Sequence, residues 1–147
     1  MPVDQKFTKP GAPLAELDAA WQAHLADAEA LFAAKRYAWA IVSALYALEI
    51  RLKVLICKRL DLKELPRAFE IHDLDALLLL AGLSRRIESK RLRKVKRNGD
   101  DILSQAEELN EIRYKPEKNW TRAQAARLLQ QLKDPSEGVL TWLSKQR

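Results

Sequence analysis

The sequence predicts an all-α fold, an antiparallel bundle of about five to six helices built as a single domain. Hydrophobic residues make up 48% of the 147 residues, and Leu and Ala dominate them while only 4 Gly are present. This composition favours helices over strands. Apolar residues also recur at steps of three and four along most of the chain. Pro66, Gly82 and Pro116 divide these periodic stretches into pieces of helix length.

Residues 1–13 are predicted to form a flexible N-terminal arm. Pro2, Pro10 and Pro13 lack an amide hydrogen and restrict the residue before them, which disfavours a regular helix. The folded domain is therefore expected to cover residues 14–147, with neither an internal repeat nor a second domain.

Two long helices are expected at the beginning of the domain. The first has one apolar face, made of Leu14, Leu17, Trp21, Leu25, Ala28 and Phe32. The second, from about Tyr37 to Leu60, carries two apolar rows, Ile41, Leu45, Leu48, Leu52 and Leu55, and then Trp39, Val42, Tyr46 and Ile50. A helix that is apolar on more than one side is typical of the centre of a bundle, and it could also supply a dimer face.

A shorter helix is predicted over residues 73–81, and Gly82 is suited to end it in the left-handed conformation. The next stretch, residues 84–99, is strongly basic and contains Glu88 as its one acidic residue. Its cations are Arg85, Arg86, Lys90, Arg91, Arg93, Lys94, Lys96 and Arg97. Two interpretations remain open for it, a solvated basic helix and a mobile hairpin arm.

Asn98-Gly99 predicts a turn after the basic stretch, and Asp100 is a suitable N-cap for a further helix. That helix is expected to continue to about Arg113 and to end before Pro116. Because its first turns are acidic, we expect it to pair with the basic stretch as an antiparallel hairpin.

Two closing helices are predicted from capping boxes, Thr121 with Gln124 and Asp134 with Glu137. Pro135 is suited to the first position of the last helix. The residues expected to be buried by these helices are Ala125, Leu128, Leu129, Leu132, Val139, Leu140 and Leu143.

The net charge of +6 and the pI near 9.5 permit an anionic partner, such as nucleic acid, a nucleotide or an acidic protein. Cys57 is the single cysteine, so no intrachain disulfide can form, and its apolar surroundings favour burial over reactivity. No apolar run approaches the ~20 residues of a membrane span, so a cytoplasmic protein without membrane contact is expected.

The familiar enzyme signatures are missing from the sequence: it has no Gly-rich phosphate loop, no metal-ligand spacing and no serine elbow. We therefore predict no cofactor and no metal. His24 lies beside the interior stripe of the first helix, where a structural role is expected. His72 precedes a helix, where its ring is expected to bond a neighbouring backbone group and fix the loop.

Arg113 falls on the inward face of its expected helix, in the series that begins with Ile102. A guanidinium stays charged at ordinary pH, so it needs a carboxylate, carbonyl groups or a ligand phosphate. Glu49 is a candidate carboxylate partner, which would make the pair structural. A ligand phosphate is the other interpretation.

Several stretches in order resemble the HEPN family of nucleotide- and RNA-associated domains. These stretches are residues 37–53 (YAWAIVSALYALEIRLK), 69–79 (FEIHDLDALLL), 109–116 (LNEIRYKP) and the closing helices over 121–143. The resemblance implies a bundle of about five helices. It also implies a homodimer, a role in toxin–antitoxin or defence systems, and often a nucleotidyltransferase-type partner protein.

Catalytic members of the HEPN family share an Arg followed a few residues later by a His, and the pair cleaves RNA at a dimer cleft. Arg113 matches the arginine, but the positions for the histidine hold Lys118, Asn119 and Trp120. None of these side chains can exchange a proton near neutral pH as imidazole does. The resemblance therefore implies a family member without the usual ribonuclease chemistry.

Three functional hypotheses follow. The leading one is a non-catalytic HEPN-like module that binds a nucleotide, RNA or a partner protein. Its expected ligand site is Arg113, Tyr114, Lys115, Lys118 and Asn119, together with the basic stretch. The second is a metal-independent endoribonuclease that uses Arg113 and an atypical proton carrier such as His72. The third is a protein-interaction subunit whose basic stretch binds an acidic protein.

Overall fold

The computed structural model describes residues 11–108, 112, 114–116 and 120–146. Within these ranges the regular structure is helical apart from one isolated bridge, which confirms the all-α prediction. The elements in chain order are α2 (Leu14–Ala33), α3 (Tyr37–Arg59), η1 (Arg67–Phe69), α4 (Leu74–Leu80), η2 (Arg86–Glu88), η3 (Lys90–Leu92), α5 (Arg93–Glu107), α6 (Arg122–Lys133) and α7 (Val139–Ser144).

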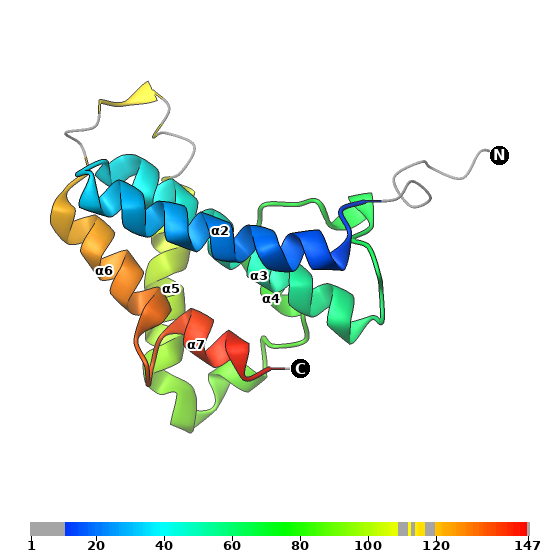
Figure 1. Cartoon of the computed structure of the whole chain (residues 1–147). Helices are drawn as coiled ribbons and strands as arrows, with labels where there is room; N and C mark the ends of the chain where they lie inside the picture. The colour runs from blue at the N-terminus through cyan, green and yellow to red at the C-terminus, as the bar shows by residue number, and fades with distance from the viewer. Residues whose placement is uncertain (1–10, 109–111, 113, 117–119, 147) are drawn as a thin grey trace.

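Helix α3 is the centre of the bundle, as its two apolar rows predicted. Of its 23 residues, 16 are buried, and it packs against α2, α4, α6 and α7. Figure 1 shows α2 lying along α3, with α5, α6 and α7 grouped toward one end of the pair. The connection from α2 to α3 is short because Lys35 adopts a positive φ of 61°. Trp39, at the beginning of the second apolar row, remains partly exposed.

The predicted boundaries of the first three helices are confirmed. Helix α2 begins at Leu14, α3 begins at Tyr37, and α4 ends two residues before Gly82. Gly82 has a φ of 77°, so it supplies the left-handed residue expected after a helix. The Asp73 carboxylate caps α4 by accepting a hydrogen bond from the backbone N–H of Ala76 at 3.1 Å.

The turn predicted at Asn98-Gly99 is wrong, because α5 runs through both residues without interruption. Burial on one face of the helix overrides the local turn preference. Val95 and Ile102, two turns apart, are 4% and 0% exposed. The Asn98 amide also donates a hydrogen bond to the Glu137 carbonyl oxygen at 3.0 Å, which ties this part of α5 to the chain before α7.

The basic and acidic stretches therefore do not form a hairpin, and Asp100 is not an N-cap. They are consecutive parts of one helix, with η2 and η3 leading into it. Residues 93–99 are helical, as the basic-helix interpretation predicts, and the hairpin of the other interpretation is not formed. Ile87 and Val95 pack in the core. Helix α5 ends at Glu107, earlier than the predicted end near Arg113.

The first predicted capping box is present, and the second is not. Thr121 accepts from the Gln124 backbone N–H, and the Gln124 side chain accepts from the Thr121 N–H, so α6 begins as expected. The Asp134 carboxylate accepts backbone hydrogen bonds two and three residues later, but these bonds close a turn. The extended backbone of Gly138 (φ −66°, ψ 140°) breaks that turn, so α7 begins only at Val139.

The end of the predicted N-terminal arm is attached to the domain. The backbone N–H of Leu65 donates to the Ala12 carbonyl oxygen, and the N–H of Leu14 donates to the Lys63 carbonyl oxygen, both at 2.8 Å. Pro13 and Glu64 form the isolated bridge between these segments. The residues expected to be buried by α6 and α7 are buried, except Leu129, which is partly buried. No helix in the described ranges is long and apolar enough to cross a membrane.

Candidate functional site

Most of the ligand site predicted from the family resemblance lies outside the described residues. Arg113, Lys118 and Asn119 belong to this group. Tyr114 is described, and its ring is 84% exposed, while Lys115 is also on the surface. The ligand-binding prediction for these five positions therefore stays a prediction.

His72 makes a structural contact with the central helix. Its Nδ1 lies 3.0 Å from Oε1 of Glu49, the carboxylate that was the predicted partner of Arg113. The same oxygen accepts a hydrogen bond from the Lys53 ammonium at 2.7 Å. Glu49 and Lys53 are both buried, whereas the His72 side chain is 80% exposed. The imidazole therefore joins the chain before α4 to α3, but its partner is a distant carboxylate and not the neighbouring backbone group that was expected.

His24 packs against the neighbouring helix. Its ring centroid lies 5.8 Å from that of Tyr46 on α3, and the two planes are inclined by 59°. This contact places His24 in the interface between α2 and α3. The position fits the structural role expected from the sequence.

Arg51 is a buried cation that the sequence did not single out. Its guanidinium donates to the Leu143 carbonyl oxygen at 3.3 Å, lies 5.4 Å from the Trp21 ring centroid and is 3.8 Å from the Asp18 carboxylate. Burial lowers the pKa of Arg51 from its usual value, and the charge of Asp18 opposes that change. Groups from two other helices, α2 and α7, thus hold this charge in place. The sequence feature that could have indicated this burial is the position of Arg51 in a helix that is apolar on nearly all sides.

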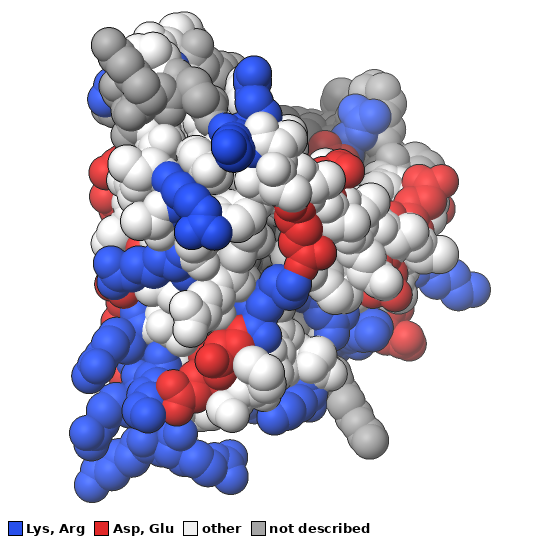
Figure 2. All heavy atoms as spheres, turned by 60° about the vertical axis from the view of Figure 1, so that its left-hand side comes forward, with Lys and Arg blue, Asp and Glu red and all other residues white. Residues whose placement is uncertain are grey.

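The structure places seven of the eight predicted cations of residues 85–97 on η2, η3 and the first turns of α5, and Arg85 directly before η2. Of the eight, seven are exposed, and Lys96 is half-buried. Figure 2 shows Lys and Arg side chains gathered at the lower edge of the molecule, the end where Figure 1 places these elements. We call the seven exposed cations the basic surface: Arg85, Arg86, Lys90, Arg91, Arg93, Lys94 and Arg97.

Few anionic groups neutralise the basic surface. The Lys94 ammonium lies 3.1 Å from the Glu137 carboxylate, and Arg86 donates to the neutral Gln146 side chain at 3.2 Å. The other members make no ion pair or side-chain hydrogen bond within the described ranges, and they are Arg85, Lys90, Arg91, Arg93 and Arg97. Charge of one sign therefore accumulates on this surface.

The basic surface surrounds a shallow hollow of about 370 Å³ at the beginning of α5. We call it the cationic hollow, and its lining residues are Lys90, Arg91, Leu92, Arg93, Lys94, Val95, Ser136 and Glu137. Helix α5 begins there after Leu92, which has no side chain able to cap it, and no acidic residue occupies the first turn. The positive end of the helix and four cationic side chains thus meet at one hollow that contains one carboxylate.

Lys96 departs from the predicted basic set. Its ammonium is 3.1 Å from the Asp100 carboxylate and 3.6 Å from that of Glu88. The hydrogen bond to Asp100, together with the charges of Asp100 and Glu88, raises the pKa of Lys96. Its charge is therefore used within the protein, and its side chain lies at a second, apolar cavity. That cavity was not predicted from the sequence.

No cluster of three or more metal-ligating side chains occurs within the part of the chain that the structure describes. Comparison of the chain with protein families, with curated proteins and with solved structures finds no match in any of the three.

Proposed function

We propose that this chain is a non-catalytic HEPN-like module that binds single-stranded RNA through its phosphates, on the basic surface around the beginning of α5. The observation that carries the proposal is the cationic hollow, where the start of a 15-residue helix has cations around it and no side-chain cap. The proposal keeps the RNA-binding part of the sequence hypothesis and assigns it to described residues.

Cations at the beginning of a helix are unfavourable within the protein itself. The helix dipole places partial positive charge at this end, where an acidic residue would be stabilising by about 0.3–1 kcal/mol and a cation has the opposite effect. Arg93 and Lys94 nevertheless occupy the first turn of α5. The backbone N–H of Arg93 already donates to the Lys90 carbonyl oxygen of η3, so the side chains supply the contacts to a ligand. A bound phosphate relieves the repulsion between these cations and accepts hydrogen bonds from the guanidinium.

A polyanion fits the basic surface better than one phosphate does. Arg85 and Arg97 do not line the cationic hollow, yet they make no ion pair within the described ranges. Cations spread beyond a single phosphate site can contact successive phosphates of a strand. We therefore assign the hollow to one phosphate and the outlying arginines to its neighbours along the strand.

The HEPN part of the proposal rests on the order of the resembling stretches and on an all-helical bundle. Residues 37–53 of the resemblance form most of central α3, and residues 121–143 include α6 and the beginning of α7. The homodimer, the nucleotidyltransferase-type partner and the toxin–antitoxin or defence role belong to the same proposal. A molar mass in solution equal to twice 16.8 kDa would support the dimer.

The non-catalytic part rests on the departure from the Arg and His motif and on the contact of His72 with Glu49. A proton carrier for RNA cleavage must reach the reacting hydroxyl. His72 bonds a carboxylate that already accepts from Lys53, and it does not line the cationic hollow. RNA therefore binds to this chain, as the endoribonuclease hypothesis also requires, but is not cleaved by it.

The test is the binding of a short fluorescein-labelled oligouridine, followed by fluorescence anisotropy over a series of salt concentrations. Replacing Arg91 and Arg93 together by Gln should weaken binding at least about tenfold, which is 1.4 kcal/mol. It should also lower the slope of log affinity against log salt by about 1.4, since each phosphate contact on a single strand contributes about 0.7.

The matched control replaces Arg36 and Arg67 by Gln. Both are exposed arginines outside the basic surface, so this variant has the same net charge as the test variant. It should bind RNA nearly as the original chain does. An equal loss of RNA affinity in the two variants would show that net charge alone decides binding, and it would contradict the proposed surface.

A cleavage assay on the same RNA separates the proposal from its enzymatic competitor. We expect no cleavage by the chain. Cleavage that disappears in Arg113→Ala or His72→Ala would overturn the non-catalytic assignment. An absence of RNA binding even at low salt would leave the protein-interaction hypothesis, in which an acidic partner covers the same surface.

A further inference from the structure

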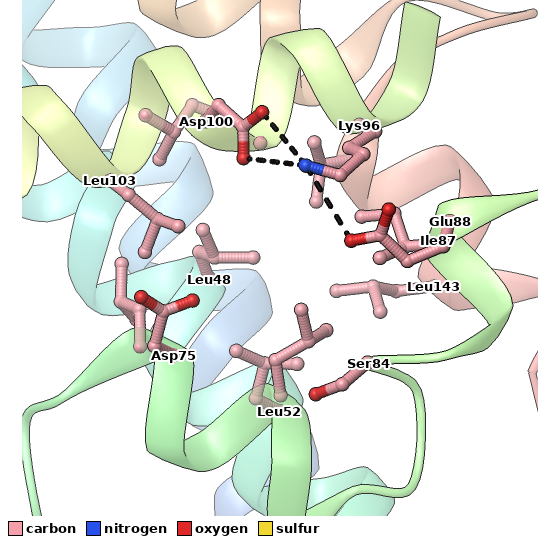
Figure 3. A pocket seen from close by; sticks show the side chains of 15 residues that line it. Leu48, Leu52, Asp75, Ser84, Ile87, Glu88, Lys96, Asp100, Leu103 and Leu143 are labelled. Carbon is pink, nitrogen blue, oxygen red and sulfur yellow. Dashed lines mark hydrogen bonds and ion pairs between the residues drawn. The ribbon is translucent and has the colours of Figure 1, made fainter. Parts of the chain in front are cut away.

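An apolar cavity of about 140 Å³ lies on another face of α5, between α3, α4, α5 and α7. Its walls are aliphatic, and no aromatic side chain contributes to them. Figure 3 shows Leu48 and Leu52 of α3 on one side and Leu103 of α5 and Leu143 of α7 on others. Because α3 and α5 also carry core residues, these walls belong to the rigid part of the bundle.

The volume of this cavity sets the size of a ligand. A cavity of about 150 Å³ lined by Leu, Ile and Phe side chains can hold a benzene molecule. The apolar cavity has nearly that volume and similar walls. One aromatic ring, or a branched aliphatic group of the same size, therefore matches the space.

The rim of the apolar cavity is acidic, in contrast to the basic surface on the same helix. Asp75, Glu88 and Asp100 contribute carboxylates, and Lys96 contributes one ammonium, so the formal charge of the rim is 1 − 3 = −2. Lys96 is held by Asp100 and Glu88. Asp75 has no ion pair or side-chain hydrogen bond within the described ranges, and Figure 3 shows its carboxylate across the cavity from Lys96.

The charge of the rim decides which polar group a ligand would carry. A carboxylate or phosphate would meet three carboxylates and a lysine that is already paired, which makes an anionic ligand unfavourable. An ammonium would be attracted by the net negative rim, and the free Asp75 carboxylate can accept its hydrogen bond. The Ser84 side chain also lines the cavity, and its hydroxyl oxygen is a second possible acceptor for the ammonium.

We propose that the apolar cavity is a binding site for a small primary amine whose body is one aromatic ring or a branched aliphatic group. The apolar body occupies the space among the leucines, and the ammonium contacts Asp75 at the rim. This inference is independent of RNA binding, because it uses a separate set of residues. Tyr114 and Lys115, the described residues of the ligand site expected from the family resemblance, do not line this cavity.

The experiment is calorimetric titration of the whole chain with benzylamine, benzyl alcohol and benzoate. The three probes share the ring and differ in the charge of the head group. Benzylamine should bind at least about tenfold more tightly than benzyl alcohol, because a hydrogen bond from a charged donor to a carboxylate is stronger than one from a neutral donor. Benzoate should show no binding.

Two variants test the two halves of the site separately. Asp75→Asn removes one carboxylate from the rim. It should lower the affinity for benzylamine about tenfold and leave the affinity for benzyl alcohol unchanged. Asp27→Asn is its control, because Asp27 is an exposed carboxylate on α2 that does not line the cavity. Leu78→Phe fills the cavity and should abolish binding of both probes.

The control for Leu78→Phe is Leu79→Phe, the same substitution at the next residue. Leu79 is 64% exposed and does not line the cavity, so binding should be retained. Leu103→Phe is a second filling variant, for use if Leu78→Phe does not give the circular dichroism of the folded chain. Equal affinity for benzylamine and benzoate, binding retained in a folded filling variant, or no binding of benzylamine at all would overturn the proposal.

Discussion

The cationic hollow and the apolar cavity lie on the same helix and differ in almost every physical property. The hollow at the beginning of α5 is open, is lined by four cations and contains one carboxylate. The cavity further along α5 is aliphatic inside and has three carboxylates and one lysine at its rim. Both sites include residues of α5, and the difference arises from the elements that adjoin it: η3 adds cations to the hollow, and α4 and η2 add carboxylates to the cavity.

The acidic and the basic residues of α5 also differ in whether they have partners within the protein. Two acidic residues of α5 have partners within the protein: Asp100 pairs with Lys96, one turn earlier in the same helix, and Asp101 accepts hydrogen bonds from Arg127 and Gln131 of α6. Of the two cations in the first turn of α5, Lys94 pairs with Glu137, and Arg93 makes no ion pair or side-chain hydrogen bond in the described part of the protein. The acidic part of α5 is therefore paired within the protein, whereas much of the basic part is not, and this is the contrast on which the proposed RNA site rests.

Among the variants that test this contrast, Asp101→Ala should change the free energy of unfolding most. The Asp101 carboxylate lies 2.5 Å from Arg127 and 2.9 Å from the amide of buried Gln131. Its loss leaves a buried donor with fewer partners, so the free energy of unfolding should fall by about 1–2 kcal/mol. Urea denaturation measures the change, and Asp27→Ala, on the exposed face of α2, should change it by less than about 0.5 kcal/mol.

Gly99→Ala tests the continuity of α5, on which both sites depend. A glycine within a helix costs about 0.5–1 kcal/mol relative to alanine. A Cβ atom at Gly99 would lie 3.7 Å from Ile87 Cδ1, which is an ordinary contact. The variant should therefore be more stable by about that amount in urea denaturation. A loss of stability would instead favour the turn that the Asn98-Gly99 pair first suggested.

The smallest predicted effect is that of Arg93→Gln. Removing a cation from the positive end of a helix should raise the free energy of unfolding by about 0.3 kcal/mol at low salt. The gain should shrink as salt screens the charges. Thermal unfolding at two salt concentrations measures it. A clear destabilisation would show that Arg93 supports the fold, and it would weaken the argument that its charge is kept for a ligand.

The sequence was sufficient to predict a helix where the spacing of apolar residues and the residues at the helix ends indicate the same bounds. Helices α2 and α3 have regular three- and four-residue steps, and α6 has a complete capping box. The mistakes fall where local signals compete with packing. Asn98-Gly99 reads as a turn, but the burial of Val95 and Ile102 on either side keeps the helix continuous.

The candidate sites could be predicted only in part, for a related reason. The basic surface comes mostly from one continuous stretch, so its charges were visible in the sequence. The apolar cavity combines residues from several elements, and Asp75 and Asp100 come together only in the folded chain. Arg51 also gave no sign that its partners would be Trp21, Asp18 and the carbonyl of Leu143.

The buried single cysteine has a practical consequence for measuring these sites. Cys57 is fully enclosed by the core, and burial raises the pKa of its thiol, so little reactive thiolate is present. A cysteine introduced in place of exposed Lys90 or Leu79 would then be the main target of a maleimide dye in the folded chain. Spectroscopic probes can thus be attached beside either site while residue 57 keeps its natural side chain.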